Sequence, residues 1–385
     1  MSQDLIQRLF NNYKFVFLSD GNQHENGFRN LLAASNSIHN SLNDLHINDA
    51  HWKFFIAQYD LKNEFENLNS KNKIIYNQPV FSFFYPEEIY EGFSFPDFSS
   101  KKTEGSVWKS SLKCLSTPED YFATVNQIKT HIQRGDIYEL NYCISFQAKV
   151  LNLDPLDLFY KLNEISEAPF SGMFKMENLF VICASPERFL KKEHSILKTQ
   201  PIKGTASRKS NTREDEDKRL ELLNSEKEKN ENVMIVDVAR NDLSRISEIG
   251  KVQVEELFGV YSYRQVHQMV STIRCELPET ISFDEIIKST FPMASMTGAP
   301  KIRAMEIIDR FENFRRQFYS GSMGYVDPVG NFDSNVIIRS VYYDTSSGEL
   351  TFSVGSAITA MCEAEKEYEE CLLKAKAIVE VIQSL

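Results

Sequence analysis

The chain has 385 residues, which is enough for one large two-layer domain or for roughly two to three smaller units. Hydrophobic residues make up 42% and charged residues 25%, values that are ordinary for a globular protein and exclude disorder throughout. The formal net charge is −11 and there is no dense basic block, so we do not expect the chain to bind nucleic acid.

The N-terminal stretch lacks the basic head and apolar core of a signal peptide, and no apolar run approaches the about 18 residues of a membrane helix. We therefore expect a cytoplasmic protein with no membrane partner. The cysteines are scattered without a C-x-x-C pair, which predicts reduced, packed thiols and neither a disulfide framework nor a zinc site. They are Cys114, Cys143, Cys183, Cys275, Cys362 and Cys371.

Residues 1 to about 100 are rich in Asn, Phe and Tyr and contain short apolar runs such as YKFVFL and FSFFY. The stretch EGFSFPDFSSKKTEGS at residues 91–106 lacks periodicity, and its Pro, Ser, Lys and Gly residues predict a linker. We therefore expect residues 1–110 to form a short N-terminal region that completes the core, and residues 111–385 to form the catalytic domain.

From Thr117 onward the chain alternates clear helices with strands. Thr117 is a predicted N-cap with Pro118 at the first helical position, apolar residues follow at helical spacing, and Gly135 ends the helix. Ser225 and Glu228 form a predicted capping box at the start of a second helix. The mixture predicts an α+β fold with antiparallel sheets, since no strand is followed by the G-x-G-x-x-G turn of a parallel doubly wound fold. Strands are expected at residues 139–146, 179–185, 251–258, 320–326, 334–343 and 350–357, and further helices at residues 299–311 and 365–385.

Two pairs of glutamates on predicted helices point to a metal site. Glu228 and Glu231 are three residues apart, as are Glu367 and Glu370, so each pair projects from one helix face. If the two helices face each other, the carboxylates gather around one point, and Mg²⁺ would relieve their repulsion through oxygen ligands. The alternative is that both are solvated helix faces, with Glu370 and Lys374 forming an ordinary ion pair.

Lys203 and Arg339 are the basic residues with unusual settings. Pro201 and Gly204 bracket Lys203, so the backbone can approach a ligand closely there, and a partly desolvated lysine with a lowered pKa can act as a nucleophile. The alternative is a surface lysine on a turn. Arg339 interrupts an apolar strand, which predicts either a structural ion pair or a clamp for an anionic substrate.

Several common catalytic motifs are missing. The sequence contains no G-x-x-x-x-G-K-[ST] loop, no H-E-x-x-H and no G-x-S-x-G, and none of its cysteines lies between glycines as an exposed nucleophile would. We therefore do not expect this chain to hydrolyse glutamine itself.

Taken in order, eight segments resemble the chorismate-utilising enzymes, a family that includes the large subunits of anthranilate synthase and aminodeoxychorismate synthase together with isochorismate and salicylate synthases. They cover roughly residues 117–385, and their number and order make the resemblance specific. The segments are GDIYELN, SPERFL, PIKGTASR, EKNENVMIVDVARNDLSRI, TGAPKIRAMEII, YSGSMGY, VIIRS and EKEYEECLLKAKA. The family fold consists of two packed antiparallel sheets flanked by helices, with the active site in a cleft between the layers.

The resemblance also implies roles for individual residues. Glu231 and Glu370 match the glutamates that bind Mg²⁺, and Glu228 and Glu367 match outer carboxylates that act through water. A dianionic substrate could not lie among four carboxylates without a cation between them. Further positions match residues that contact chorismate, namely Arg339 and Tyr319 at the enolpyruvyl carboxylate, and Gly204, Thr205, Gly355, Ser356, Ala357 and Lys374 elsewhere.

Lys203 indicates the branch of the family. Anthranilate, isochorismate and salicylate synthases have a small residue before this Gly-Thr, whereas one group of aminodeoxychorismate synthases has lysine in the form P-I-K-G-T. In that group the lysine attacks C2 of chorismate as the C4 hydroxyl leaves, and ammonia then displaces it by attacking C4. Asn141 replaces the lysine that activates water in isochorismate-type enzymes, which argues against water as the nucleophile.

This resemblance implies amination of chorismate for 4-aminobenzoate and folate synthesis, with two partner proteins. A glutamine amidotransferase would supply ammonia, and a lyase dependent on pyridoxal phosphate would then remove pyruvate. Two alternatives stay open: anthranilate synthase component I, and a catalytically silent homologue that binds chorismate or a partner subunit without turnover. The first is disfavoured because a Lys203 bound covalently at C2 would block amination at that carbon. The second is disfavoured because a protein that only binds chorismate has no need of a nucleophile such as Lys203.

The sequence departs from the family pattern at three places. Gln268 occupies the position of a histidine that can protonate the leaving hydroxyl, and His267, one residue earlier, is the candidate to replace it. Ala357 stands where the family has the last glycine of a G-A-G turn, which would strain a backbone with positive φ by about 1 kcal/mol or more. The region before residue 117 is short and has no clear tryptophan-binding signature, so we expect no feedback inhibition by tryptophan.

Overall fold

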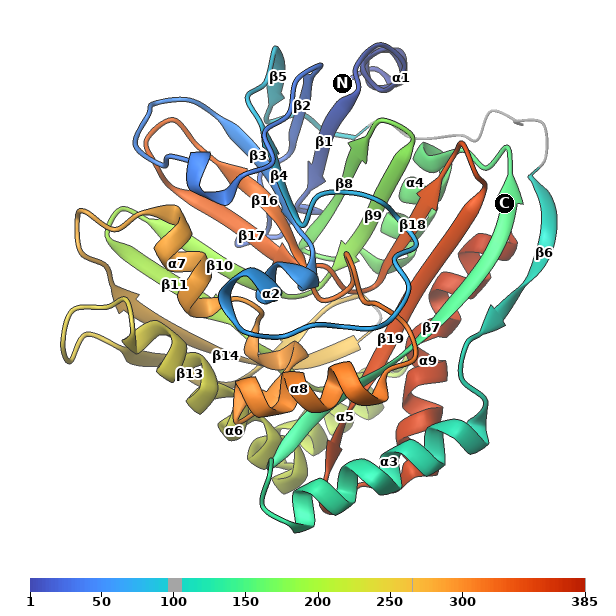
Figure 1. Cartoon of the computed structure of the whole chain (residues 1–385), viewed down its shortest axis with the longest axis vertical. Coiled ribbons are helices and arrows are strands. Elements are labelled where there is room, and N and C mark those ends of the chain that lie inside the picture. Colours follow the sequence, from blue (N-terminus) through green and yellow to red (C-terminus); the bar gives the residue numbers. More distant parts are fainter. Residues whose placement is uncertain (96–105, 265, 385) are drawn as a thin grey trace.

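The computed structural model describes residues 1–95, 106–264 and 266–384. Two large antiparallel sheets dominate it, and helices cover their outer faces (Figure 1). The fold prediction of an α+β protein with two packed antiparallel sheets is therefore confirmed. No helix in the described parts of the chain is both long and apolar enough to cross a membrane.

Each sheet combines strands from distant parts of the chain. The ten-stranded sheet runs in the order β15 (Gly298–Ala299), β7 (Glu139–Leu151), β19 (Glu349–Thr359), β18 (Ser340–Asp344), β9 (Leu179–Ser185), β8 (Phe170–Met176), β1 (Phe15–Asp20), β2 (Leu31–Ser35) and β5 (Glu88–Glu91), with β6 (Val107–Cys114) beside β7. The nine-stranded sheet runs β12 (Ile202–Ser207), β14 (Val266–Glu276), β11 (Ile196–Gln200), β10 (Arg188–Glu193), β17 (Phe332–Val336), β16 (Ser322–Val326), β3 (Lys53–Ala57) and β4 (Phe81–Phe84), with β13 (Gln253–Ser262) beside β14.

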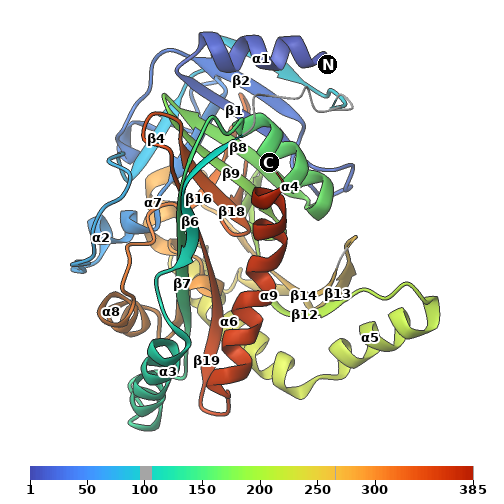
Figure 2. The same cartoon turned by 90° about the vertical axis from the view of Figure 1, so that its right-hand side faces the viewer.

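Helices lie along both sheets, and α9 runs beside the ten-stranded sheet while α5 extends away from the body of the molecule (Figure 2). The α-helices are α1 (Gln3–Asn12), α2 (Lys62–Phe65), α3 (Pro118–Gln133), α4 (Pro155–Ser166), α5 (Thr212–Asn224), α6 (Glu226–Ser244), α7 (Phe283–Thr290), α8 (Lys301–Phe311) and α9 (Ala364–Gln383). Short 3₁₀ turns are η1 (Leu42–Asp44), η2 (Tyr59–Leu61) and η3 (Ala294–Met296).

Strand β1 shows why its sequence is apolar without alternation. All six of its residues are buried, because both faces of the sheet are covered. Phe17 packs into the layer between the sheets, where its ring centroid lies 5.0 Å from that of Phe54 on β3. Val16 and Leu18 point to the other face and join a second apolar cluster formed with α1, α3, α4 and α9. The N-terminal strands thus belong to both sheets and to the core.

The predicted helix starts are largely confirmed. Thr117 and Asp120 form a reciprocal capping box at the start of α3, and Gly135 follows that helix with a φ of 79°. Ser225 is the N-cap of α6 and accepts a hydrogen bond from the Glu228 N–H at 3.3 Å. The capping box predicted there is only half formed in the described structure, because the Glu228 carboxylate lines a cavity instead of returning to the Ser225 N–H.

One predicted strand is wrong. Residues 334–343 do not form a single strand: β17 ends at Val336 in one sheet and β18 begins at Ser340 in the other. The chain crosses between the layers at residues 337–339, where Arg339 has a φ of 52°. The apolar run is continuous in sequence because both strands and the crossing are largely enclosed, so hydrophobicity gives no sign of the break.

The linker predicted at residues 91–106 falls mostly on residues 96–105, which lie outside the described residues. The boundary near residue 110 stays a prediction.

The aromatic packing around Phe17 yields a test of whether residues 1–110 complete the core. Phe17 is fully buried and its ring also contacts those of Phe174 and Tyr325. We expect Phe17→Ala to lower the free energy of unfolding by about 3–5 kcal/mol, because a large cavity opens between the sheets. Urea unfolding followed by circular dichroism measures the change. Val329→Ala, at a side chain that is 76% exposed, is the control and should change it by less than about 0.5 kcal/mol. A loss below about 1 kcal/mol for Phe17→Ala would show that the N-terminal strands are dispensable.

Candidate active site

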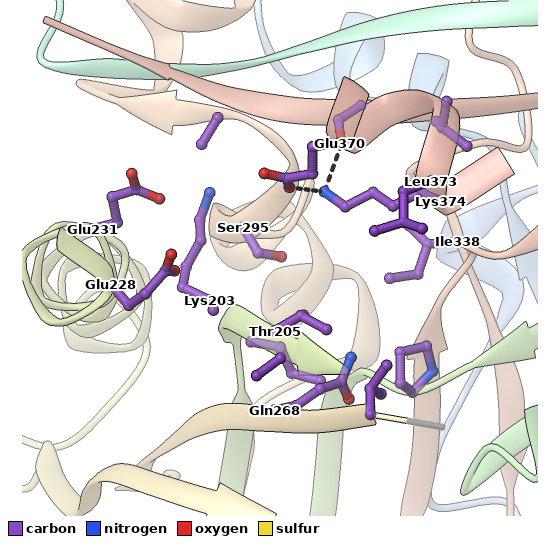
Figure 3. A pocket seen from close by; sticks show the side chains of 18 of the residues that line it. Lys203, Thr205, Glu228, Glu231, Gln268, Ser295, Ile338, Glu370, Leu373 and Lys374 are labelled. Carbon is purple, nitrogen blue, oxygen red and sulfur yellow. Dashed lines mark hydrogen bonds and ion pairs between the residues drawn. The ribbon is translucent and has the colours of Figure 1, made fainter. Parts of the chain in front are cut away.

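A cavity of about 840 Å³ opens where the two sheets part, between α6 and α9 (Figure 3). Strands β7, β12, β14 and β19, helices α5, α6 and α9, and connecting segments that carry Glu187, Tyr319 and Arg339 line it. The cavity brings together nearly all of the side chains that the sequence singled out. They are Asn141, Lys203, Gly204, Thr205, Glu228, Glu231, Tyr319, Arg339, Gly355, Ala357, Glu367, Glu370 and Lys374.

Lys203 reaches the cavity from an irregular part of β12. The pairing of β12 with β14 shifts between Ile202 and Thr205, so Lys203 and Gly204 form a β-bulge. Gly204 has a φ of 89°, a left-handed conformation that favours glycine, and a Cβ there would come within 2.9 Å of the Glu228 carboxylate. The bulge takes Lys203 out of the regular pleat, and its Nζ donates a hydrogen bond to Glu139 Oε1 at 2.7 Å.

The prediction that Lys203 has a lowered pKa is wrong for this state of the protein. Burial by itself would lower the pKa of Lys203, but the carboxylates of Glu139, Glu231 and Glu187 outweigh burial and hold it above the ordinary lysine value. Lys203 is therefore an ammonium group at neutral pH, and it must lose a proton before it can attack a carbon atom.

The four predicted metal ligands line the cavity from two helices. Glu228 and Glu231 lie on α6, and Glu370 lies across the cavity on α9 (Figure 3). Lys374 pairs with Glu370 at 2.6 Å, and Lys227 lies 3.5 Å from Glu367. Among the described residues, no three His, Cys, Asp or Glu side chains are grouped closely enough to hold a metal ion, so the expected gathering around one point is not formed in this structure.

The electrostatics of these glutamates nevertheless suit a divalent cation. Burial raises the pKa of Glu231 to about 7, Lys203 opposes that effect, and the pKa values of Glu228 and Glu367 are also raised by burial. Glu370 differs, since Lys374 outweighs the effect of burial and lowers its pKa. The positive charge of the nearby lysines therefore does not fully compensate the negative charge of the buried carboxylates. Carboxylate oxygen atoms are also the ligands that Mg²⁺ prefers.

Arg339 resolves one alternative left open by the sequence. Its guanidinium lines the cavity and makes no hydrogen bond or ion pair with any residue that the structure describes. Burial lowers the pKa of Arg339, although an arginine stays charged at any physiological pH. A partly buried guanidinium without a carboxylate partner favours the clamp for an anion over the structural ion pair. Tyr319 lines the same cavity.

His267 does not line the cavity, which corrects its expected position. Successive side chains of β14 point to opposite faces of the sheet, so Gln268 faces the cavity and His267 faces away. The His267 ring is held by Ser262 Oγ at 2.8 Å and by Asp215 Oδ1 at 3.1 Å. His267 is buried, and the cavity lining includes its neighbour Gln268 but not His267 itself.

The segment of Gly355, Ser356 and Ala357 is also corrected, because it is part of strand β19 and not a turn. Ala357 is not among the described residues with positive φ, so its methyl group causes no backbone strain. Ser356 points away from the cavity and shares a hydrogen bond of 2.8 Å with the Tyr121 hydroxyl. Gly355 must stay small, since a Cβ would come within 2.6 Å of Cys143 Sγ.

Two buried glutamates were not predicted. Glu139 is 1% exposed and pairs with Lys203, and Glu187 is 3% exposed and lines the cavity. Burial raises the pKa of Glu187 to about 7. Both carried a signal in the sequence, because each is an acidic residue at the end of an apolar strand. Gln268, which the sequence marked only as a departure from the family pattern, also lines the cavity. Its buried Oε1 atom has no hydrogen-bond partner in the described parts of the chain.

The chain is similar to known proteins in sequence and in fold. The family model described as "chorismate binding enzyme" matches residues 7–380. The chain is 38% identical to aminodeoxychorismate synthase component 1 of Escherichia coli over 72% of its length and 60% of that protein. It is 43% identical to the chloroplastic aminodeoxychorismate synthase of Arabidopsis thaliana over 71% of its length and 30% of that protein. It thus spans less than two thirds of the length of either relative.

A solved structure shares the fold. The crystal structure of anthranilate synthase component I from Streptococcus pneumoniae superposes with a TM-score of 0.76 at 22% sequence identity, and the match covers 95% of this chain and 92% of that one.

The buried Glu187 carboxyl predicts a pH-dependent stability. Its folded pKa of about 7 exceeds the ordinary value of 4.5, so the folded protein binds more protons than the unfolded chain between those pH values, and stability falls as pH rises through that range. A pKa difference of this size corresponds to about 3 kcal/mol. We measure the free energy of unfolding in urea for Glu187→Gln and for the wild type. The value for Glu187→Gln minus that for the wild type should increase by up to about 3 kcal/mol between pH 5 and pH 8. Glu380→Gln, at an exposed residue of α9, is the control. A difference that stays constant with pH would show that Glu187 is ionised throughout.

Proposed function

The chain belongs to the family of chorismate binding enzymes, and on that premise we propose that it is the chorismate-aminating component of an aminodeoxychorismate synthase, with Lys203 as its nucleophile. The observation that carries the proposal is the position of Lys203, whose ammonium group lies in a cavity lined by the paired glutamates and by the unpartnered Arg339. The names of the two aminodeoxychorismate synthases support this choice within the family.

The cavity suits a dianionic substrate such as chorismate. Arg339 would bind the enolpyruvyl carboxylate, with Tyr319 beside it, because a guanidinium pairs two of its N–H groups with one carboxylate. Glu231 and Glu370 would hold Mg²⁺ directly and Glu228 and Glu367 through water. When bound, the ion would neutralise the ring carboxylate among these glutamates and draw electron density from the ring. Lys374, Gly204, Thr205 and Gly355 would complete the contacts.

The chemistry requires one nucleophile and one acid. In its neutral form Lys203 would form a C–N bond at C2 while the ring double bond shifts and the C4–O bond breaks. Glu187 is the acid best placed to protonate the departing hydroxyl, which leaves as water, since it lines the cavity and its pKa is raised to about 7. It takes the role that the sequence suggested for His267.

Ammonia would then attack C4 and release Lys203, so that nitrogen replaces the hydroxyl and the enolpyruvyl group stays on the ring. A separate glutamine amidotransferase subunit would supply the ammonia, in line with the "component 1" in the name of the Escherichia coli relative. A lyase dependent on pyridoxal phosphate would remove pyruvate afterwards to give 4-aminobenzoate. Asn141, which can neither accept nor donate a full proton, leaves water without activation.

The test is an incubation of the purified chain with chorismate, Mg²⁺ and excess ammonium at alkaline pH, with products separated by chromatography and identified by mass. We expect aminodeoxychorismate, converted to 4-aminobenzoate only after the lyase is added. Lys203→Ala should lower the rate at least about 100-fold because the covalent route is lost. Lys376→Ala, at an exposed lysine of α9, is the control and should keep the wild-type rate.

Two other outcomes would contradict the proposal. Anthranilate formed directly would mean that Lys203 does not occupy C2 and that the chain is an anthranilate synthase component. Chorismate that stays unchanged even with an amidotransferase partner and glutamine would indicate a silent homologue.

A further inference from the structure

The ion pair between Lys203 and Glu139 connects the two sheets behind the cavity. Glu139 lies on β7 of the ten-stranded sheet and Lys203 on β12 of the nine-stranded sheet, and Nζ and Oε1 are 2.7 Å apart. The backbone of Glu139 is fixed on both sides, by Ala299 of β15 and by Thr359 of β19. The carboxylate is therefore held in place before any ligand enters.

The Glu139 carboxylate is buried together with Lys203 and meets it through one oxygen atom. Glu139 is 1% and Lys203 9% exposed, so the pair is largely removed from bulk water. Oε1 accepts the hydrogen bond from Lys203, whereas the buried Oε2 has no hydrogen-bond partner among the residues that the structure describes. A bare oxygen is costly on a carboxylate and less costly on a neutral carboxylic acid, where it is a carbonyl oxygen. Among the described residues, Oε1 of Glu139 is the acceptor that directly contacts the Lys203 ammonium group.

Other charged groups face Lys203 but stand farther from it. Only the Glu139 carboxylate lies within 4.0 Å of Nζ among the described residues. The remaining groups act on the lysine through their charge, and none accepts a hydrogen bond from it. They are Glu187 before β10, Glu228 and Glu231 on α6, and Glu370 on α9, where Lys374 faces the same carboxylates.

We propose that Glu139 takes the proton from Lys203 and so converts the resting ammonium group into the amine that attacks the substrate. One N–H bond of Nζ breaks and one O–H bond forms on Oε1, which leaves a neutral amine beside a neutral carboxylic acid and needs no other reactant. This role rests on the proposed function, because it has meaning only if Lys203 is the nucleophile.

The experiment follows the covalent step alone. The chain is mixed with chorismate and Mg²⁺ without ammonia, quenched at intervals between pH 7 and pH 9, and analysed by intact-protein mass for an adduct equal to chorismate minus water. In the wild type the proton stays inside the pair, whereas in Glu139→Gln it must leave to solvent. We therefore expect the rate of Glu139→Gln to be about 100-fold below the wild type at pH 7. The rate of Glu139→Gln divided by the rate of the wild type should then rise by up to about tenfold for each unit of increasing pH. Comparing rates as a ratio cancels the titration of Glu187, which both proteins share.

Two further variants make the result specific. Glu139→Asp keeps a carboxylate, so its rate divided by that of the wild type should be lower than one but constant with pH. Glu380→Gln, on the exposed face of α9, should match the wild type at every pH. Thermal melting shows that each variant is folded before rates are compared.

The outcomes separate the two proposals. If Glu139→Gln forms the adduct at the wild-type rate, or with a ratio that does not change with pH, Glu139 is not the acceptor. A ratio for Glu139→Asp that rises as steeply as that of Glu139→Gln would also overturn its role. If the wild type forms no adduct on Lys203 at any pH, the proposed function itself fails.

Discussion

The packing of the two antiparallel sheets is the constraint on which every functional side chain depends. Where aromatic rings such as Phe17 and Phe54 fill the space between the layers, the sheets are held together without water. Where the layers part, β7, β12 and β19 leave a cavity that α6 and α9 enclose. Lys203 and the paired glutamates of the cavity stand on strands and helices, whose backbone pairing holds them, whereas Glu187, Tyr319 and Arg339 stand on the segments between these elements.

The second constraint is the balance of positive and negative charge around the cavity, and the side chains there do not fully neutralise one another. Acidic side chains line the cavity from α6, α9 and the start of β10, and the lysines nearby are partly committed to them. Arg339 has no carboxylate partner among the described residues, while Glu187 and Glu231 have pKa values raised to about 7. Unpaired charges of both signs around one cavity are costly in a resting protein. The proposed binding of a substrate with carboxylates together with a divalent cation would offset that cost.

Much of the site could be predicted from the sequence, because local rules and ordered motifs both act along the chain. The capping box at Thr117 and the glutamate spacing on α6 and α9 are local properties, and they appear as expected. The predictions that were wrong concern how segments distant in the sequence are placed against one another in the fold. Whether His267 or Gln268 faces the cavity depends on the register of β14 against β12. The crossing at Arg339 depends on two sheets that the apolar pattern cannot tell apart.

The contact of Lys203 with Glu139 illustrates the same difficulty in energetic form. From the sequence, a lysine next to glycine in a buried segment suggests a neutral amine, because desolvation disfavours the charged form. The fold instead places the Glu139 carboxylate of the other sheet 2.7 Å from Lys203 and adds the charges of Glu231 and Glu187, which together raise the pKa of Lys203. The reversal has a chemical advantage, since a neutral buried amine would react with any electrophile that entered the cavity. The ion pair keeps the lysine protonated and oriented, and in the proposed mechanism its partner Glu139 would receive the proton when the substrate is bound.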